Sequence, residues 1–188
     1  MNCSEILPTI IAVVPSAIVA IVSICQTGRM HREDRKEREN KALAERIKHK
    51  LEIFYYPYLL LAKENTSLFE VFSKERLERN EDFRTLSSLL SNEEFSNNDN
   101  AILQRIIEND VHLKELINKS AHVVDDNDIR EALVKSATHY SIIELAYNKK
   151  ITGEVERFEP FVHPNDVYKM VEKKAMELEK EMLNAIPK

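Results

Sequence analysis

A run of uncharged residues near the N-terminus constrains the fold of this chain more than any other feature. Residues 6–25 read ILPTIIAVVPSAIVAIVSIC, and none of these twenty positions holds Asp, Glu, Lys or Arg. An α-helix rises ~1.5 Å per residue, so the run is about 30 Å long, which matches the hydrocarbon core of a bilayer. The sequence therefore predicts a transmembrane helix at residues 6–25, preceded by a short extracytoplasmic tail at residues 1–5.

Three other interpretations of this run are a cleaved signal peptide, a lipoprotein signal and a buried helix of a soluble fold. A signal peptide begins with basic residues, but residues 1–5 contain no Lys or Arg. A lipoprotein signal ending at Cys25 requires a small residue before the cysteine, and Ile24 is large. We therefore favour an uncleaved anchor and keep the lipoprotein and the buried helix as alternatives.

The charges beside the run predict its orientation. Glu5 is the only charged residue before it, whereas five cations follow it closely. Loops rich in Lys and Arg stay in the cytoplasm, so we expect a single-pass protein of the bacterial inner membrane with its N-terminus outside. These cations, which we call the basic collar and which should lie at the lipid surface, are Arg29, Arg32, Arg35, Lys36 and Arg38.

Charge is divided unevenly along the rest of the chain. Residues 29–50 hold nine Lys and Arg and five Asp and Glu, which gives a net charge of +4. Because the whole chain carries −5 and Glu5 accounts for −1, residues 51–188 carry −8. A basic segment is attracted to anionic lipid, whereas binding to duplex nucleic acid requires a basic domain. We therefore expect membrane lipid as a partner and no duplex nucleic acid.

The composition predicts an all-α protein. Only Gly28 and Gly153 are glycines, so the chain lacks the glycine-rich loops of Rossmann and P-loop nucleotide sites. Leu, Ile, Glu, Lys and Ala dominate, and these residues favour helices. We expect a basic juxtamembrane helix at residues 26–50 and a cytosolic helical bundle at residues 51–188.

Local signals predict where helices begin and end. Pro57 lacks a backbone donor and disfavours helix at the preceding residue, so we expect a kink or break near Tyr56. A helix is expected over residues 81–90, and the polar stretch at residues 91–100 is expected to be a loop. Asp128 and Glu131 have the spacing of a capping box at the start of another helix.

No residue pattern predicts catalysis, a metal site or a cofactor. Glu108, His112 and Glu115 share a helical face, but zinc sites need further ligands that the sequence does not show. Residues 125–128 read DDND, yet they lack the glycine and the downstream glutamate of a calcium loop. We therefore interpret both sets as solvated or capping residues and expect a protein that is not an enzyme.

Aromatic rings follow a short basic stretch after the collar. Rings beside cations suit base stacking and phosphate contact, so a nucleotide or short oligonucleotide could bind there. The other interpretation is that the rings belong to the core. The residues concerned are Lys48, His49, Lys50, Tyr55 and Tyr56.

The predicted anchor carries a polar stripe. Thr9, Ser16 and Ser23 recur every seven residues, and Ala12 and Ala20 flank Ser16 at a spacing of four. Small and hydroxylated residues let transmembrane helices approach closely, which predicts a homo-oligomer.

Two prolines interrupt the same segment. Pro8 and Pro15 weaken its helix by freeing backbone carbonyls. Kinked helices in a symmetric bundle could splay apart, and the polar stripe would then line a narrow pore. A monomeric anchor, whose hydroxyl groups bond to their own helix, is the alternative.

The layout of anchor, basic collar and compact helical domain resembles the small transmembrane effectors of bacterial phage-defence systems. The nucleotide-gated channel of the Hailong system is the most similar type, and it implies an oligomeric membrane protein paired with an enzyme that makes a DNA-oligomer ligand. The resemblance concerns the architecture and transfers no binding residues. We expect a ligand-gated pore or membrane-disrupting effector. The alternatives are a membrane-tethered scaffold that recruits a protein partner and an anchored enzyme.

Overall fold

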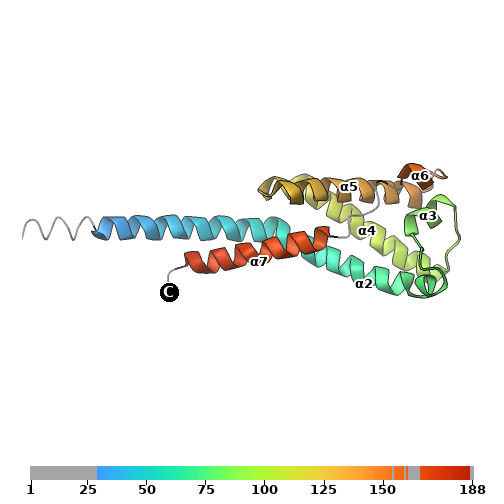
Figure 1. Cartoon of the computed structure of the whole chain (residues 1–188), viewed down its shortest axis with the longest axis horizontal. Helices are drawn as coiled ribbons and strands as arrows, with labels where there is room; N and C mark the ends of the chain where they lie inside the picture. The colour runs from blue at the N-terminus through green and yellow to red at the C-terminus, as the bar shows by residue number, and fades with distance from the viewer. Residues whose placement is uncertain (1–28, 154, 159, 161–165, 187–188) are drawn as a thin grey trace, which may run out of the picture. The chain divides into compact units, whose positions relative to one another are not determined.

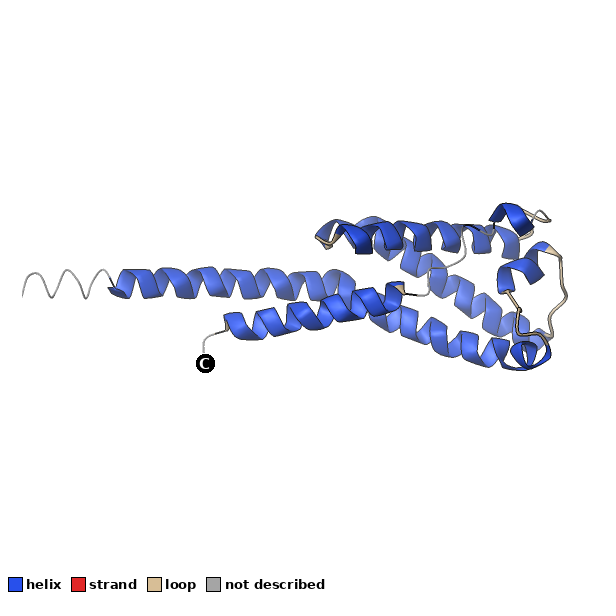
Figure 2. Ribbon diagram, in the orientation of Figure 1, coloured by secondary structure: helices blue, strands red, loops and turns tan. Residues whose placement is uncertain are grey.

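The computed structural model describes residues 29–153, 155–158, 160 and 166–186. Throughout this part of the chain the regular secondary structure is helical, without strands (Figure 2). The predicted all-α class is therefore confirmed. Among the described residues, no helix combines the length and the apolar character needed to cross a membrane. The anchor predicted at residues 6–25 lies outside the described residues.

The chain divides into two compact units, Met1–Arg46 with Met182–Lys188 and Ile47–Glu181. Residues 29–50 are α-helical, and the side chains of residues 29–42 are all exposed. The later elements, labelled in Figure 1 where space allows, are η1 (Leu51–Tyr55), α2 (Tyr56–Arg79), α3 (Thr85–Leu90), α4 (Asn97–Ser120), η2 (Ala121–Val123), α5 (Asn127–Tyr147), α6 (Val155–Phe158) and α7 (Val167–Ala185).

The long helices of the second unit pack around α4. This helix contacts α2 along one side and α5 along another (Figure 1). Apolar residues of α4 recur at helical spacing, and Leu103, Ile106 and Ile107 are all buried. They join Phe72 of α2 and Ile143 of α5 in one hydrophobic cluster. Burial of this stripe on both sides makes α4 the central helix of the unit.

Pro57 is preceded by a widened helical turn. The backbone N–H of Tyr56 donates to Leu51 O, five residues back, as in a π-helix. Proline has no N–H, and its ring clashes with the carbonyl four residues earlier. The chain stays helical on each side of Pro57. We infer that the wider turn of η1 accommodates both the missing N–H and the proline ring. Of the kink or break expected near Tyr56, the break is absent, because the helix continues through a π-helical segment.

The start of α4 corrects the expected loop at residues 91–100. The Ser96 side chain accepts a hydrogen bond from Asp99 N at 3.1 Å and caps the helix, which begins at Asn97. The helix expected over residues 81–90 is also shorter, because α3 begins at Thr85. Ser96 and the polar residues after it form the cap and the first turn of α4. Composition alone does not distinguish such a helix start from a loop.

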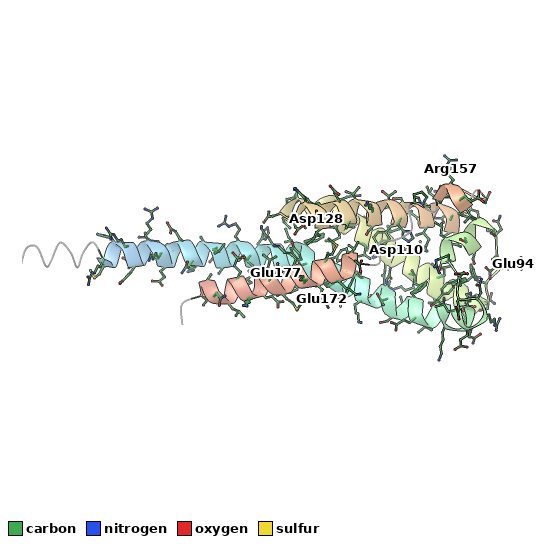
Figure 3. All side chains as sticks on the ribbon, viewed as in Figure 1. Glu94, Asp110, Asp128, Arg157, Glu172 and Glu177 are labelled. Carbon is green, nitrogen blue, oxygen red and sulfur yellow. The ribbon has the colours of Figure 1, made fainter. Side chains whose placement is uncertain are left out.

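The start of α5 differs from the expected capping box. The side chain of Asp126, rather than that of Asp128, caps the helix by accepting from Ile129 N at 3.1 Å. The helix therefore begins at Asn127, slightly earlier than expected. Asp128 is exposed in the first turn of α5 (Figure 3).

An arginine joins the end of α2 to the start of α4. Arg76 Nη2 lies 2.9 Å from Asp99 Oδ2, and Nη1 donates to Phe72 O at 2.9 Å. Its guanidinium also lies over the rings of Phe72 and Phe95, 4.6 Å and 5.0 Å from their centroids. This arrangement holds a half-buried charge among aromatic rings.

Candidate functional site

The predicted stripe and the two prolines of the anchor lie outside the described residues. They therefore stay predictions, as does the short tail before them. The positions concerned are Pro8, Thr9, Ala12, Pro15, Ser16, Ala20 and Ser23.

The basic collar is exposed along the helix of residues 29–50. Arg35 Nε donates to Glu39 Oε1 at 2.8 Å, and Arg38 Nε donates to Asp34 O at 3.1 Å. The other three collar cations line a shallow open hollow together with a single acid; these residues are Arg29, Arg32, Lys36 and Glu33. The collar is thus available to an anionic surface, as a lipid contact requires.

The residues of the predicted anionic-ligand contact have different surroundings. Tyr55 is buried, and burial raises the pKa of its hydroxyl to about 12. Tyr56 is exposed and donates to Glu179 Oε1 at 2.9 Å. Lys48 lies 3.7 Å from Glu52, and Lys50 pairs with Asp125. His49 is exposed.

Lys48, Lys50 and Tyr56 therefore each contact a carboxylate of the protein itself. The Lys50 ammonium holds the pKa of the Asp125 carboxyl below its usual value. The ligand contact stays a prediction, and of these five residues Lys48, His49 and Tyr56 are exposed.

No group of three His, Cys, Asp or Glu side chains in the described part of the chain is placed to hold a metal ion. His122 Nδ1 lies 3.1 Å from Lys119 O. Of the acidic stretch at residues 125–128, Asp125 pairs with Lys50 and Asp126 caps α5. These acids have structural partners within the protein.

A buried polar cluster between α2, α4 and α5 is the feature that the sequence did not predict. Asp110 lies on α4 (Figure 3). It is 5% exposed, and its Oδ1 accepts a hydrogen bond from Asn65 Nδ2 of α2 at 2.7 Å. The same Asn65 nitrogen donates to Ile106 O at 3.3 Å. Asn65 Oδ1 is buried and has no hydrogen-bond partner among the described residues. The two side chains therefore join α2 to α4 through an incompletely bonded pair.

Two tyrosines complete this cluster. The hydroxyl groups of Tyr58 (α2) and Tyr140 (α5) hydrogen-bond to each other. Both residues are buried. Burial raises the pKa of Tyr58 to about 12, an effect that the bond to Tyr140 partly opposes and nearby Asp110 adds to. Burial raises the pKa of Tyr140 as well, and Tyr58 and Asp110 contribute in the same direction. The tyrosines therefore stay protonated and offer hydroxyl groups beside the carboxyl group.

The Asp110 carboxyl is bonded to an amide rather than to a cation in the described part of the chain. Among the described residues, no Lys, Arg or His forms an ion pair with it, and burial raises its pKa to about 8 although the Asn65 amide opposes this shift. A charged carboxylate is strongly disfavoured in a low-dielectric interior. Strongly perturbed buried acids are common at functional sites, although structural networks also produce them. The cluster is therefore our candidate functional site.

A signal for this cluster is present in the sequence. Asp110 lies in the apolar register of α4, between Ile106 and Leu113, where a hydrophobic residue is the rule. Asn65 interrupts the stripe of α2 between Leu61 and Leu68 in the same way. Polar residues inside apolar stripes could therefore have pointed to the cluster, although not to their pairing.

Comparisons with known proteins do not add a family to this description. No protein-family model, curated protein or solved structure matches the chain significantly.

Proposed function

We propose that this chain is a single-pass protein of the bacterial inner membrane that forms a homo-oligomer and acts as a ligand-gated pore or membrane-disrupting effector in phage defence. The observation that carries the proposal is the uncharged run at residues 6–25, which has the length of a membrane span. It is followed by a helix whose side chains at residues 29–42 are all exposed and which carries the basic collar. In this proposal the N-terminus lies outside and the helical bundle lies in the cytoplasm.

The bundle has the character of a regulatory domain in this proposal. Its central helices are joined by a buried polar cluster, and packed helices of this kind can switch between two discrete arrangements. An anionic ligand of the nucleotide class, binding near Lys48 and His49, would act on the helix that enters η1. Splaying of the anchor helices at Pro15 would then open a pore lined by Thr9, Ser16 and Ser23.

A membrane-tethered scaffold is the second candidate, and exposed apolar residues favour it. Leu60 and Val71 of α2 are 73% and 67% exposed, and their spacing of eleven residues places them on one face of the helix. Exposed apolar side chains on one face can contribute to contacts with a protein partner. Such a scaffold would recruit its partner without changing the permeability of the membrane.

Membrane potential measured after induced expression separates the two candidates. We expect the wild-type chain to depolarise cells, as reported by a voltage-sensitive dye. Replacing Thr9, Ser16 and Ser23 together with leucine should abolish this effect, because it removes the polar stripe while keeping the segment apolar.

In the matched control, leucine replaces Ile10, Ala17 and Ile24, each of which directly follows a residue of the polar stripe. This variant should still depolarise cells. Both triple variants must be present in the membrane fraction at wild-type levels. Full depolarisation by the first variant would contradict a pore lined by this stripe. No depolarisation by the wild type, with or without an added nucleotide ligand, would favour the scaffold.

A further inference from the structure

We propose that Asp110 and Asn65 form a proton-dependent lock between α4 and α2, which is closed while the carboxyl group carries a proton and opens when the group ionises. The inference concerns the helical bundle alone and does not depend on the proposed membrane function. It rests on the burial of the carboxyl group, its hydrogen bond to Asn65 and the buried amide oxygen that has no donor.

The hydrogen-bonding inventory of the pair favours the neutral acid. Asn65 Nδ2 already donates to Asp110 Oδ1 at 2.7 Å. A carboxylate can only accept, so an ionised Asp110 leaves Asn65 Oδ1 without a donor. A protonated carboxyl group supplies one O–H donor, and an amide and a carboxylic acid joined by one hydrogen bond can form a second in the opposite direction. Protonation therefore satisfies a buried acceptor that ionisation leaves unpaired.

Among the described residues, no Lys or Arg of the elements packed against α4 forms an ion pair with Asp110. From α2 the polar groups at the site are Tyr58 and Asn65, and from α5 the group is Tyr140, beside the ring of His139. On α4 the next turn carries Lys114, whose Nζ lies 2.6 Å from Glu144 of α5.

The ionisable groups of the short segments η1 and η2, which flank the site, have partners other than Asp110. Tyr55 of η1 faces the carboxyl groups of Asp125 and Asp126. Glu52 of η1 pairs with Lys48, and His122 of η2 contacts Lys119 O. On the outer side of α4, Arg105 pairs with Glu64 of α2 at 3.1 Å. In the described part of the protein, the hydrogen-bond partner of Asp110 is thus the Asn65 amide, and no ion pair would compensate its negative charge.

The direction of the pH effect follows from proton linkage. The pKa of Asp110 is about 8 in the folded chain and about 3.9 for an unfolded aspartate. Between these values the folded protein binds a proton that the unfolded chain releases. The stabilisation is therefore complete below the unfolded pKa, decreases as the pH rises through this window, and is lost above the folded pKa.

The test compares the full-length chain with Asp110→Asn in detergent, by chemical denaturation from about pH 5 to about pH 8. Asparagine keeps an N–H donor at this position but cannot ionise. We expect the wild type to lose up to about tenfold in its folding equilibrium constant per pH unit relative to Asp110→Asn. Glu115→Gln, the same chemical change at an exposed position of α4, should follow the wild type.

Two spectroscopic measurements keep the proposal testable if the variant folds poorly. Infrared spectra of the wild type near neutral pH should contain the carbonyl stretch of a protonated carboxyl group, and Glu115→Gln should retain it. Amide hydrogen exchange around Asp110, corrected for intrinsic rates, should increase above about pH 8 in the wild type. The absence of the protonated-carboxyl band, or identical pH profiles for the wild type and Asp110→Asn, would overturn the lock.

Discussion

Arg76 and Asp110 illustrate how two charged residue types are accommodated inside one helical unit. Arg76 has a counter-ion 2.9 Å away in Asp99 and lies over phenylalanine rings. Its guanidinium can therefore remain charged while largely shielded from water. Asp110 accepts a hydrogen bond from the Asn65 amide and has no ion pair among the described residues, and burial raises its pKa. The partner present at each position decides whether the charge or the neutral form is stabilised.

We predict that Arg76→Met destabilises the protein by about 2 kcal/mol, because it removes the cation–π contacts and the counter-ion of Asp99. The free energy of unfolding from chemical denaturation measures this change. The control is Arg79→Met, which removes an exposed pair with Glu75 and should change stability by less than about 0.5 kcal/mol. Equal effects of the two substitutions would contradict a special role for Arg76.

At the scale of helices, the sequence predicts the type of element better than its ends. The apolar residues of α4 recur at helical spacing and coincide with its buried face, because helical packing requires that periodicity. The start at Asn97 depends on the Ser96 side chain bonding to Asp99 N, one of several caps that this polar stretch could form. Likewise, the continuation through Pro57 depends on a π turn, which the propensity of individual residues does not reveal.

Contacts between distant residues were not predictable from the sequence. Tyr56 and Glu179 are 123 residues apart, yet their side chains are hydrogen-bonded. Asn65 and Asp110 are 45 residues apart, and their pairing requires α2 and α4 to be packed in one particular register. Helical periodicity places a residue on a face of its own helix, but it does not set the register between two helices. For that reason the composition indicated the fold class while the candidate site emerged from the structure.

The cap of α4 gives a prediction for this scale. Ser96→Ala should destabilise the protein by about 1 kcal/mol, because it removes the acceptor for Asp99 N at the helix start. Thermal or chemical denaturation measures the effect. Ser67→Ala serves as the control, since that exposed hydroxyl bonds to Lys63 O inside α2 and alanine favours a helix interior. The helix start at Asn97 would be in doubt if both substitutions were neutral.

Across the whole molecule, charge and hydrophobicity are distributed unevenly along the sequence. An uncharged run, a segment of net charge +4 and a remainder of net charge −8 follow one another. We propose that this order reflects a membrane span, a lipid-surface helix and a cytoplasmic bundle. Positive flanks are retained in the cytoplasm, and an acidic bundle is repelled by anionic lipid.

Thiol labelling tests this central claim most directly, because Cys3 and Cys25 are the only cysteines and lie at opposite ends of the run. Variants with one cysteine each, Cys25→Ser and Cys3→Ser, are expressed in bacteria and treated with a membrane-impermeant maleimide before and after permeabilisation. The proposed topology predicts that both variants sediment with membranes, that Cys3 is labelled in intact spheroplasts, and that Cys25 is labelled only after permeabilisation. Recovery of the chain in the soluble fraction, or protection of Cys3 in intact spheroplasts, would contradict it.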